Sequence, residues 1–502
     1  MGIKFKKKIL FYNSIAPLIY QGTTIICGFI LPRLILSHFG TEVNGLVNSI
    51  KQFLGVIAFL ELGVGAVVQS SLYRPLADGD IINVSKVITS ADRFFRRLGY
   101  ILAFYVVAMI FFYPELVKQN FGFYFTASLI IAISISLFAQ YFFGIVNRLL
   151  LLADQKGYIQ YAAQIVAVII NTLACYILIV LDCSVQVVYG TTSCIYFLQP
   201  FLLHMYIRKY YSLDRNIQYD LEPIKQKWNG IAQHIAAVVL TSSDIIVLTT
   251  CSTLINVSIY TVYYLPVSGM KLLIMSTISG IQALIGNLWA KRDLIELRKI
   301  FAWTEWLIHT GTTLIFTITA ILIVPFVQVY TQGVNDANYI QPLFAILFVA
   351  ANSGHCLRLP YNIMILAAGH YKQTQHNYII AAVLNIVISI VGVVLFGLMG
   401  VAAGTFVALA YQTVWMAWYN SKNFIQWPMR KFFKQIGVDA VSAVSIYIVS
   451  GYFTMTGVSY LEWVILAIKV TFSGIIVALL INYVFYKRFL LEITVKLMKR
   501  FC

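Results

Sequence analysis

The sequence predicts an all-α polytopic membrane protein with about fourteen transmembrane helices. Hydrophobic residues make up 60% of the 502 positions, and charged residues make up only 11%. A bilayer core about 30 Å thick needs roughly 20 apolar residues per helix, and a spanning backbone must satisfy its own hydrogen bonds. Lys and Arg gather in every second polar joint between the apolar stretches, which is typical of loops on one side of a membrane.

The apolar stretches place the helices along the chain. We expect spans at 13–36, 45–70, 98–113, 120–146, 158–180, 184–207, 231–250, 257–286, 303–329, 340–368, 378–396, 399–419, 437–455 and 461–486. With the segment before residue 13 inside, the other predicted cytoplasmic segments are 71–97, 147–157, 208–230, 287–302, 369–377, 420–436 and 487–502.

The basic residues orient these spans. The predicted cytoplasmic segments hold 30 of the 36 Lys and Arg residues, and Lys118 is the one base in an external joint. This asymmetry predicts a multi-pass protein of a cytoplasmic membrane with both termini in the cytoplasm. Most of the net charge of +17 therefore comes from bases in the cytoplasmic segments, which orient the spans, and not from a compact basic domain. We expect no nucleic-acid partner.

The joints are too short for an enzyme. The longest, 71–97, cannot hold a soluble catalytic domain, and no Walker A loop, HExxH helix or hydrolase elbow occurs. Asp78-Gly79-Asp80 has an Asp-x-Asp form, but these residue types also have ordinary roles in turns. We predict that the chain is not an enzyme and has neither a cofactor nor a metal site.

Short motifs recur in the two halves of the chain at spacings of 214 to 217. The matches are Asn13-Ser-Ile-Ala16 with Asn229-Gly-Ile-Ala232, Gly63–Ala66 with Gly280–Ala283, Asn171 with Asn385, and Gly190-Thr191 with Gly404-Thr405. Six spans separate the copies, so both enter the membrane in the same direction, as in a parallel repeat with a pseudo-two-fold axis along the membrane normal. Two such lobes around a central cavity are the architecture of alternating access.

The repeat divides the chain. The predicted parts are an N-terminal lobe of spans 1 to 6 at 1–207, a cytoplasmic linker at 208–230, a C-terminal lobe of spans 7 to 12 at 231–420, and two additional spans with a cytoplasmic tail at 421–502.

Several runs resemble bacterial polysaccharide flippases nearly from end to end. They are Phe39-Gly-Thr-Glu-Val-Asn-Gly45, Leu60-Glu-Leu-Gly-Val-Gly-Ala66, Leu72-Tyr-Arg-Pro-Leu76, Val257-Ser-Ile-Tyr260, Ala367-Ala-Gly-His370 and Phe396-Gly-Leu-Met-Gly-Val-Ala-Ala-Gly-Thr405. The resemblance is to O-antigen and capsule repeat-unit flippases of the multidrug/oligosaccharidyl-lipid/polysaccharide exporter superfamily. It implies transport of an undecaprenyl-diphosphate-linked oligosaccharide across the bacterial cytoplasmic membrane, with a glycan polymerase and glycosyltransferases as pathway partners. These motifs are mostly Gly and aromatic packing positions, so they identify the fold better than the cargo.

Five bases lie within or near the spans, where each costs about 2.5–3.5 kcal/mol unless it faces a wet interior with a partner. The four that we assign to the predicted substrate site are Arg33, Lys51, Lys271 and Arg358, and Lys469 lies in the additional spans. Two interpretations are open for the first two, because bases near the ends of spans either extend to the interface or face a cavity. Lys271 is mid-span, shortly after a Pro and a Gly that can bend the helix.

An excess of bases over acids in the spans predicts an anionic substrate. A diphosphate suits Arg as a bidentate partner and Lys as a point charge. Lipid II flippases of the same superfamily likewise hold a pyrophosphate with basic cavity residues, although the bases here do not align with theirs. An exporter of cationic drugs would favour acids in its cavity.

The two acids recognised inside the bilayer, Asp244 and Glu61, are the predicted coupling residues. Their expected partners form two i, i+4 pairs on helix faces: Asn385 with Ser389, and Val401 with Thr405. With Asp244 these offer the hard oxygens that a small cation prefers. The arrangement resembles the sodium site of lipid II flippases, except that Ser389 stands where that pattern has a second acid.

Two other interpretations of these residues remain open. Asp244 could instead neutralise Lys271 in a structural pair. The Asn and Thr could belong to repeat packing, since Asn171 and Thr191 mirror them, although Gly28 stands at the first-half position of Asp244.

The leading hypothesis is therefore a flippase for undecaprenyl-diphosphate-linked repeat units, with Na⁺ or H⁺ as the coupling ion. The alternatives are a cation-coupled exporter of small molecules and a lipid II-type flippase. A membrane-embedded glycan polymerase is disfavoured because it would need a large external loop.

Overall fold

The computed structural model describes residues 3–57, 64–117, 121–215, 217–218, 231–276 and 278–501. This part of the chain is helical and contains no β-strand, which confirms the predicted all-α class. It divides into two compact units, one formed by Met1–Val238 with Thr253–Ser258 and the other by Val239–Ser252 with Ile259–Cys502.

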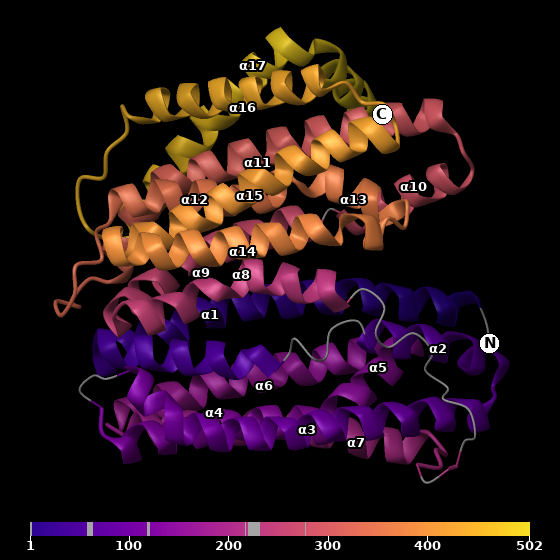
Figure 1. The fold of residues 1–502 in the computed structure, drawn as a ribbon, viewed down its shortest axis with the longest axis vertical. Coiled ribbons are helices and arrows are strands. Elements are labelled where there is room, and N and C mark those ends of the chain that lie inside the picture. Colours follow the sequence, from indigo (N-terminus) through magenta and orange to yellow (C-terminus); the bar gives the residue numbers. More distant parts are fainter. Residues whose placement is uncertain are drawn as a thin grey trace. The chain divides into compact units, whose positions relative to one another are not determined.

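The first unit contains seven α-helices and one π-helical turn among its described residues, in addition to the beginnings of α8 and α9. They are α1 (Ile3–Gly55), α2 (Val64–Asp78), α3 (Ile81–Val117), α4 (Phe123–Ala139), η2 (Gln140–Gly144), α5 (Ile145–Ala153), α6 (Gly157–Val180) and α7 (Val185–Tyr210). Within this unit α1 packs against α6, and α4 packs against both α3 and α7 (Figure 1).

The long helix α1 contains the first predicted span and the beginning of the second. Gly40 interrupts it with φ 83° and ψ 176°, a conformation that glycine adopts at little steric cost. Beyond this kink, Asn44 Nδ2 donates to Ser258 Oγ at 2.7 Å. A Cβ on Gly45 would meet the backbone of Leu254, so this glycine lets Thr253–Ser258 lie directly against α1.

The second unit contains the rest of α8 (Ile231–Cys251) and α9 (Leu254–Ser276) and all the later helices. These are α10 (Ile278–Ala290), α11 (Leu294–Tyr330), α12 (Pro342–Leu357), α13 (Leu359–Ala367), α14 (Tyr371–Phe396), α15 (Leu398–Asn423), α16 (Met429–Ser450) and α17 (Tyr460–Phe501). The helix α9 runs through Pro266 and Gly269 before it ends.

A tight hairpin of α14 and α15 organises the second unit (Figure 1). Gly397 joins the two helices with φ 59°, a left-handed conformation that favours glycine. A Cβ on Gly392 or Gly400 would meet the backbone of the other, so these glycines let the two helices touch. Small residues allow this kind of close backbone approach between membrane helices.

Length and composition make this chain a multi-pass membrane protein. Eleven helices in the described ranges are long and apolar enough to cross a bilayer. This number is lower than fourteen partly because α1 joins the first predicted span to the beginning of the second, and α8 contributes only Ser242–Cys251 as a shorter apolar helix. The predicted limits of the lobes, linker and tail stay a prediction.

Candidate functional site

Asp244, on α8, lies at the centre of a buried polar cluster in the second unit. Asp244 is only 6% exposed. Tyr260 of α9 donates its hydroxyl to Asp244 Oδ2 at 2.8 Å. Thr405 of α15 lies 3.1 Å from Oδ1 and 3.0 Å from Oδ2 and donates its hydroxyl to this carboxylate. Side chains from α9 and α15 therefore both bind the carboxylate of α8.

A second layer of hydrogen bonds holds Thr405 in place. Asn385 Nδ2 donates to the Thr405 hydroxyl oxygen at 3.1 Å. The side-chain amide oxygen of Asn385 accepts a hydrogen bond from the Ser389 hydroxyl at 3.3 Å and from the Ser243 hydroxyl at 3.4 Å. The structure thus brings together four of the five residues that the sequence assigned to the cation site.

The α14–α15 hairpin explains why Asn385 and Ser389 lie beside Thr405. Asn385 and Ser389 are one turn apart on α14, and a Cβ on Gly404 would meet the Ser389 hydroxyl and the Asn385 carbonyl. Val401, the fifth predicted residue, is buried one turn before Thr405 on α15. Its carbonyl retains a second lone pair beyond the helical hydrogen bond, as every backbone carbonyl does.

The cluster offers several oxygen atoms from buried residues. They are the two carboxylate oxygens of Asp244, the amide oxygen of Asn385 and the hydroxyl oxygens of Tyr260, Thr405, Ser389 and Ser243. Such hard oxygens are ligands for small cations. A carboxylate desolvated in this way favours a conformation or ligand that completes its shell.

The structural pair proposed as an alternative does not form as a direct contact. Across the described residues, no ion pair joins Asp244 to Lys271. The Lys271 ammonium instead lies 5.8 Å from the centre of the Tyr264 ring, one helical turn after Tyr260 on α9.

Arg358 lies between α12 and α13 and is 9% exposed. One guanidinium nitrogen donates to the side-chain oxygen of Gln412 on α15, and another lies 3.4 Å from His355 Nδ1. Its Nε has no hydrogen-bond partner among the described residues. The guanidinium is therefore held by neutral groups and keeps its charge uncompensated by a direct carboxylate contact.

In the first unit, Lys51 faces a cavity of about 320 Å³. Its ammonium lies 3.4 Å from the Tyr189 hydroxyl oxygen, to which it donates, and 4.6 Å from the centre of that ring. Asn171, Thr192 and Tyr196 line the same cavity. Arg33 is half-buried on α1. Glu61 lies outside the described residues.

Sequence reasoning missed Tyr260 and Ser243 as partners in the Asp244 cluster. Ser243 directly precedes Asp244, and Tyr260 follows it by 16 residues on the next helix. Neither has a helical spacing that could have revealed the contact, because a hydroxyl next to an acid in sequence normally points to another face.

A larger buried network also escaped the sequence reasoning, which counted two acids within the spans. His309 Nδ1 lies 2.6 Å from Asp439 Oδ2, and the Tyr361 hydroxyl donates to Glu305 at 2.7 Å. Trp427 donates its indole N–H to the other Glu305 oxygen at 2.9 Å. The i, i+4 spacing of Glu305 and His309 was the available signal. This network ties α16 to α11.

Solved structures share this fold. The lipid II flippase MurJ, in an inward closed conformation, matches with a TM-score of 0.68 over 95% of this chain and 98% of its own, at 16% identity. The chain has the MurJ fold. No family model and no curated protein matches the sequence.

Two transporters extend the comparison. An inward-facing multidrug resistance MATE family transporter of the MOP superfamily matches with a TM-score of 0.58 over 80% of this chain and 94% of its own, at 16% identity. A MOP superfamily transporter from Pyrococcus furiosus, described with a binding pocket of reverse polarity, has a TM-score of 0.54 over 83% and 96%, at 15% identity. These names are those of a flippase and of transporters.

Proposed function

We propose that this protein is a flippase that moves an undecaprenyl-diphosphate-linked oligosaccharide repeat unit to the outer leaflet of a bacterial cytoplasmic membrane by alternating access. The observation that carries the proposal is a set of intramembrane bases without a carboxylate partner in the described chain: Lys51, Lys271 and Arg358. Bases in a membrane interior are costly, and they mark pathways for charged substrates.

The chemistry of these bases suits a diphosphate better than a cationic drug. The guanidinium of Arg358 presents an unused Nε donor, and the two ammonium groups contact aromatic rings or a hydroxyl rather than acids. A diphosphate supplies the missing negative charge and several acceptor oxygens. The MurJ fold supports the proposal because the MurJ structure is named as that of a lipid II flippase.

The Asp244 cluster is the proposed coupling site for Na⁺ or H⁺. Exporting an anionic headgroup leaves an empty carrier that must return, and a cation that prefers one conformation biases this return. The carboxylate has hydroxyl partners from α9 and α15, so a small shift between these helices changes the number of oxygens around it.

Lys271→Ala tests the substrate site. We expect the variant to insert normally but to lose transport, measured as surface glycan in a complemented flippase-null strain. Lys469→Ala is the matched control, because Lys469 is an exposed base on α17 that we leave out of the site. Normal surface glycan from correctly inserted Lys271→Ala would contradict the assignment.

Two other cargoes are separable by genetics. The extent of the match to MurJ favours lipid II as the second candidate, and the MATE match keeps a small-molecule exporter as the third. Rescue of a strain depleted of its lipid II flippase, without rescue of a repeat-unit flippase mutant, would favour lipid II. Drug resistance without either rescue would favour an exporter.

A further inference from the structure

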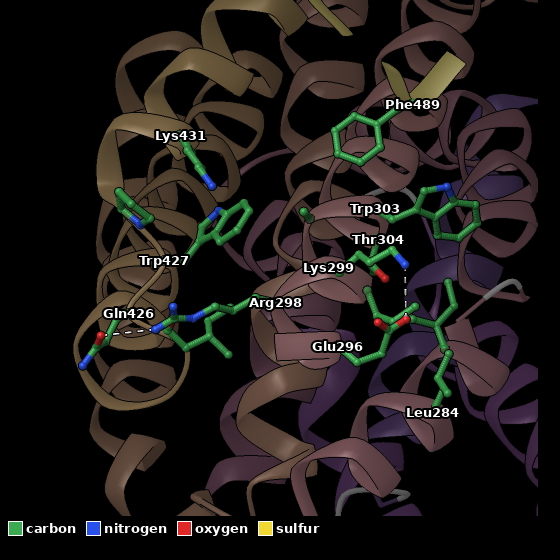
Figure 2. Close-up of a pocket in the computed structure, with 15 residues that line it drawn as sticks. Leu284, Glu296, Arg298, Lys299, Trp303, Thr304, Gln426, Trp427, Lys431 and Phe489 are labelled. Carbon is green, nitrogen blue, oxygen red and sulfur yellow. Dashed lines mark hydrogen bonds and ion pairs between the residues drawn. The ribbon is translucent and has the colours of Figure 1, made fainter. Parts of the chain in front are cut away.

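A cavity of about 580 Å³ in the second unit lies away from Asp244, Lys271 and Arg358, none of which lines it. It is lined by α10, the beginning of α11, the turn before α16, the first turn of α16 and Phe489 of α17 (Figure 2). We propose that this cavity binds the phosphate headgroup of an anionic glycerophospholipid from the cytoplasmic leaflet.

Arg298 is fixed at the cavity by neutral acceptors. Its Nε donates to the Ile425 carbonyl at 2.8 Å, and a terminal nitrogen donates to the Gln426 side-chain oxygen at 3.2 Å (Figure 2). These contacts orient the guanidinium but leave its charge without an ion pair among the described residues. An oriented guanidinium is well suited to a phosphate because its donors are already in place.

Lys431 provides a second positive charge. Its ammonium lies 3.8 Å from the centre of the Trp427 ring and has no ion pair in the described ranges. That ring is itself held by the indole hydrogen bond to the buried Glu305. Lys431 also belongs to the first turn of α16, where the helix dipole adds partial positive charge.

The remaining charged residues of the cavity largely cancel. Lys299 pairs with Glu296 at 3.7 Å, as the dashed line in Figure 2 shows. The net excess of positive charge therefore comes from Arg298 and Lys431, which lie on a different side of the cavity from Trp303 and Phe489 in Figure 2.

The uncharged lining favours a lipid over a free anion. The same cavity has an apolar surface formed by Ile281, Leu284, Trp303 and Phe489, and Leu284 is 45% exposed. An acyl chain can cover such a surface, whereas an inorganic anion cannot. Tryptophan is also enriched at the level of lipid headgroups.

The predicted topology places the bases of the cavity on the cytoplasmic side of the membrane, at the level of the lipid headgroups. Arg298 lies in segment 287–302 and Lys431 in segment 420–436, both expected in the cytoplasm from their charge. Anionic lipids are concentrated in the cytoplasmic leaflet, and basic pockets between membrane helices bind their headgroups. This inference concerns a lipid that stays with the protein and is independent of the proposed cargo.

The test measures lipid binding to the full-length protein in nanodiscs or by native mass spectrometry. We expect phosphatidylglycerol to bind more tightly than phosphatidylcholine. In Arg298→Gln/Lys431→Gln its affinity should fall about 30-fold, since each base contributes about 1 kcal/mol at the membrane surface. Arg97→Gln/Lys209→Gln, which removes two exposed bases from the first unit, should retain the wild-type affinity.

Three outcomes would overturn the proposal. Equal binding of phosphatidylglycerol and phosphatidylcholine would remove the charge argument. Unchanged phosphatidylglycerol binding by the Arg298 and Lys431 variant would place the lipid elsewhere. Displacement by pyrophosphate or undecaprenyl diphosphate at lower concentration than phosphatidylglycerol would assign the cavity to the cargo instead.

Discussion

The two units carry related polar clusters with opposite charge. In the second unit, Ser389 donates to the Asn385 amide one turn earlier, and Thr405 connects this amide to Asp244. In the first unit, the residues 214 positions earlier are Asn171 and Cys175, and the Cys175 thiol lies 3.6 Å from the Asn171 amide oxygen.

The charged member distinguishes the two clusters. Lys51 and Asn171 line one cavity in the first unit, and Gly28 stands at the position that mirrors Asp244. A hydrogen-bonded asparagine therefore occurs in both units. The acid in one unit and the ammonium in the other are the groups from which we expect different functions: a cation at Asp244 and an anion at Lys51.

Removing the acid should have the largest effect. Asp244→Asn retains a similar shape but loses the negative charge that attracts a cation. We expect the variant to lose the response of transport to a Na⁺ or H⁺ gradient, measured in vesicles with each gradient in turn. Coupling free energies of about 1–3 kcal/mol correspond to a change of roughly 5- to 150-fold.

The control for this variant is Cys175→Ser, which alters the equivalent position of Ser389 in the first unit. It should leave the gradient response intact. If wild type and Asp244→Asn respond equally to both gradients, Asp244 is not the coupling residue and Glu61 becomes the next candidate.

Removing the Lys51 ammonium tests whether the first unit binds an anion. Lys51→Ala should lower transport of the lipid-linked anion on the order of 10-fold or more, because hydrogen bonds to charged groups contribute about 1.5–3 kcal/mol. The initial transport rate in vesicles gives the size of the loss. Lys209→Ala, at an exposed base of α7, should transport normally. A wild-type rate for Lys51→Ala would make Lys51 a residue that only extends to the interface.

A pair of equivalent glycines separates packing from charge. A Cβ on Gly404 would meet Ser389 and Asn385, whereas a Cβ on Gly190 would meet nothing within 4 Å. Gly404→Ala should therefore destabilise the protein by about 1–3 kcal/mol, the usual cost of overpacking. Gly190→Ala should be neutral or slightly stabilising, as alanine favours a helix. Thermal unfolding in detergent measures both, and equal melting temperatures would mean that the two clusters have the same packing.

Tyr260→Phe should have the smallest effect. The variant removes one oxygen near Asp244, and a hydrogen bond contributes about 1 kcal/mol. The ion concentration for half-maximal transport should rise about fivefold. Tyr189→Phe, which removes the hydroxyl beside Lys51, should leave that concentration unchanged. If both variants raised this ion concentration equally, the effect would come from a general change in folding and not from the loss of an oxygen ligand to the cation.

The sequence could predict only those neighbours in the Asp244 cluster that are close together along the chain. Asn385 with Ser389, and Val401 with Thr405, are each one helical turn apart, so the spacing alone puts each pair on one face. The arrival of Tyr260 from α9 depends on how that helix packs beside α8, and no sequence period encodes it. The same reason hid the contact of His309 with Asp439, which are 130 positions apart.

The sequence by itself determined the helical class, the apolar stretches long enough for spanning helices and the asymmetry of the basic joints. These follow from local rules, because hydrocarbon thickness sets the length of an apolar helix and each helix satisfies its own backbone. Only the tertiary structure decided which charges remain unpaired and which loops share a cavity. Arg298 and Lys431 meet one cavity because α11 and α16 pack together, and Asn385 meets Thr405 because glycines let α14 and α15 approach closely.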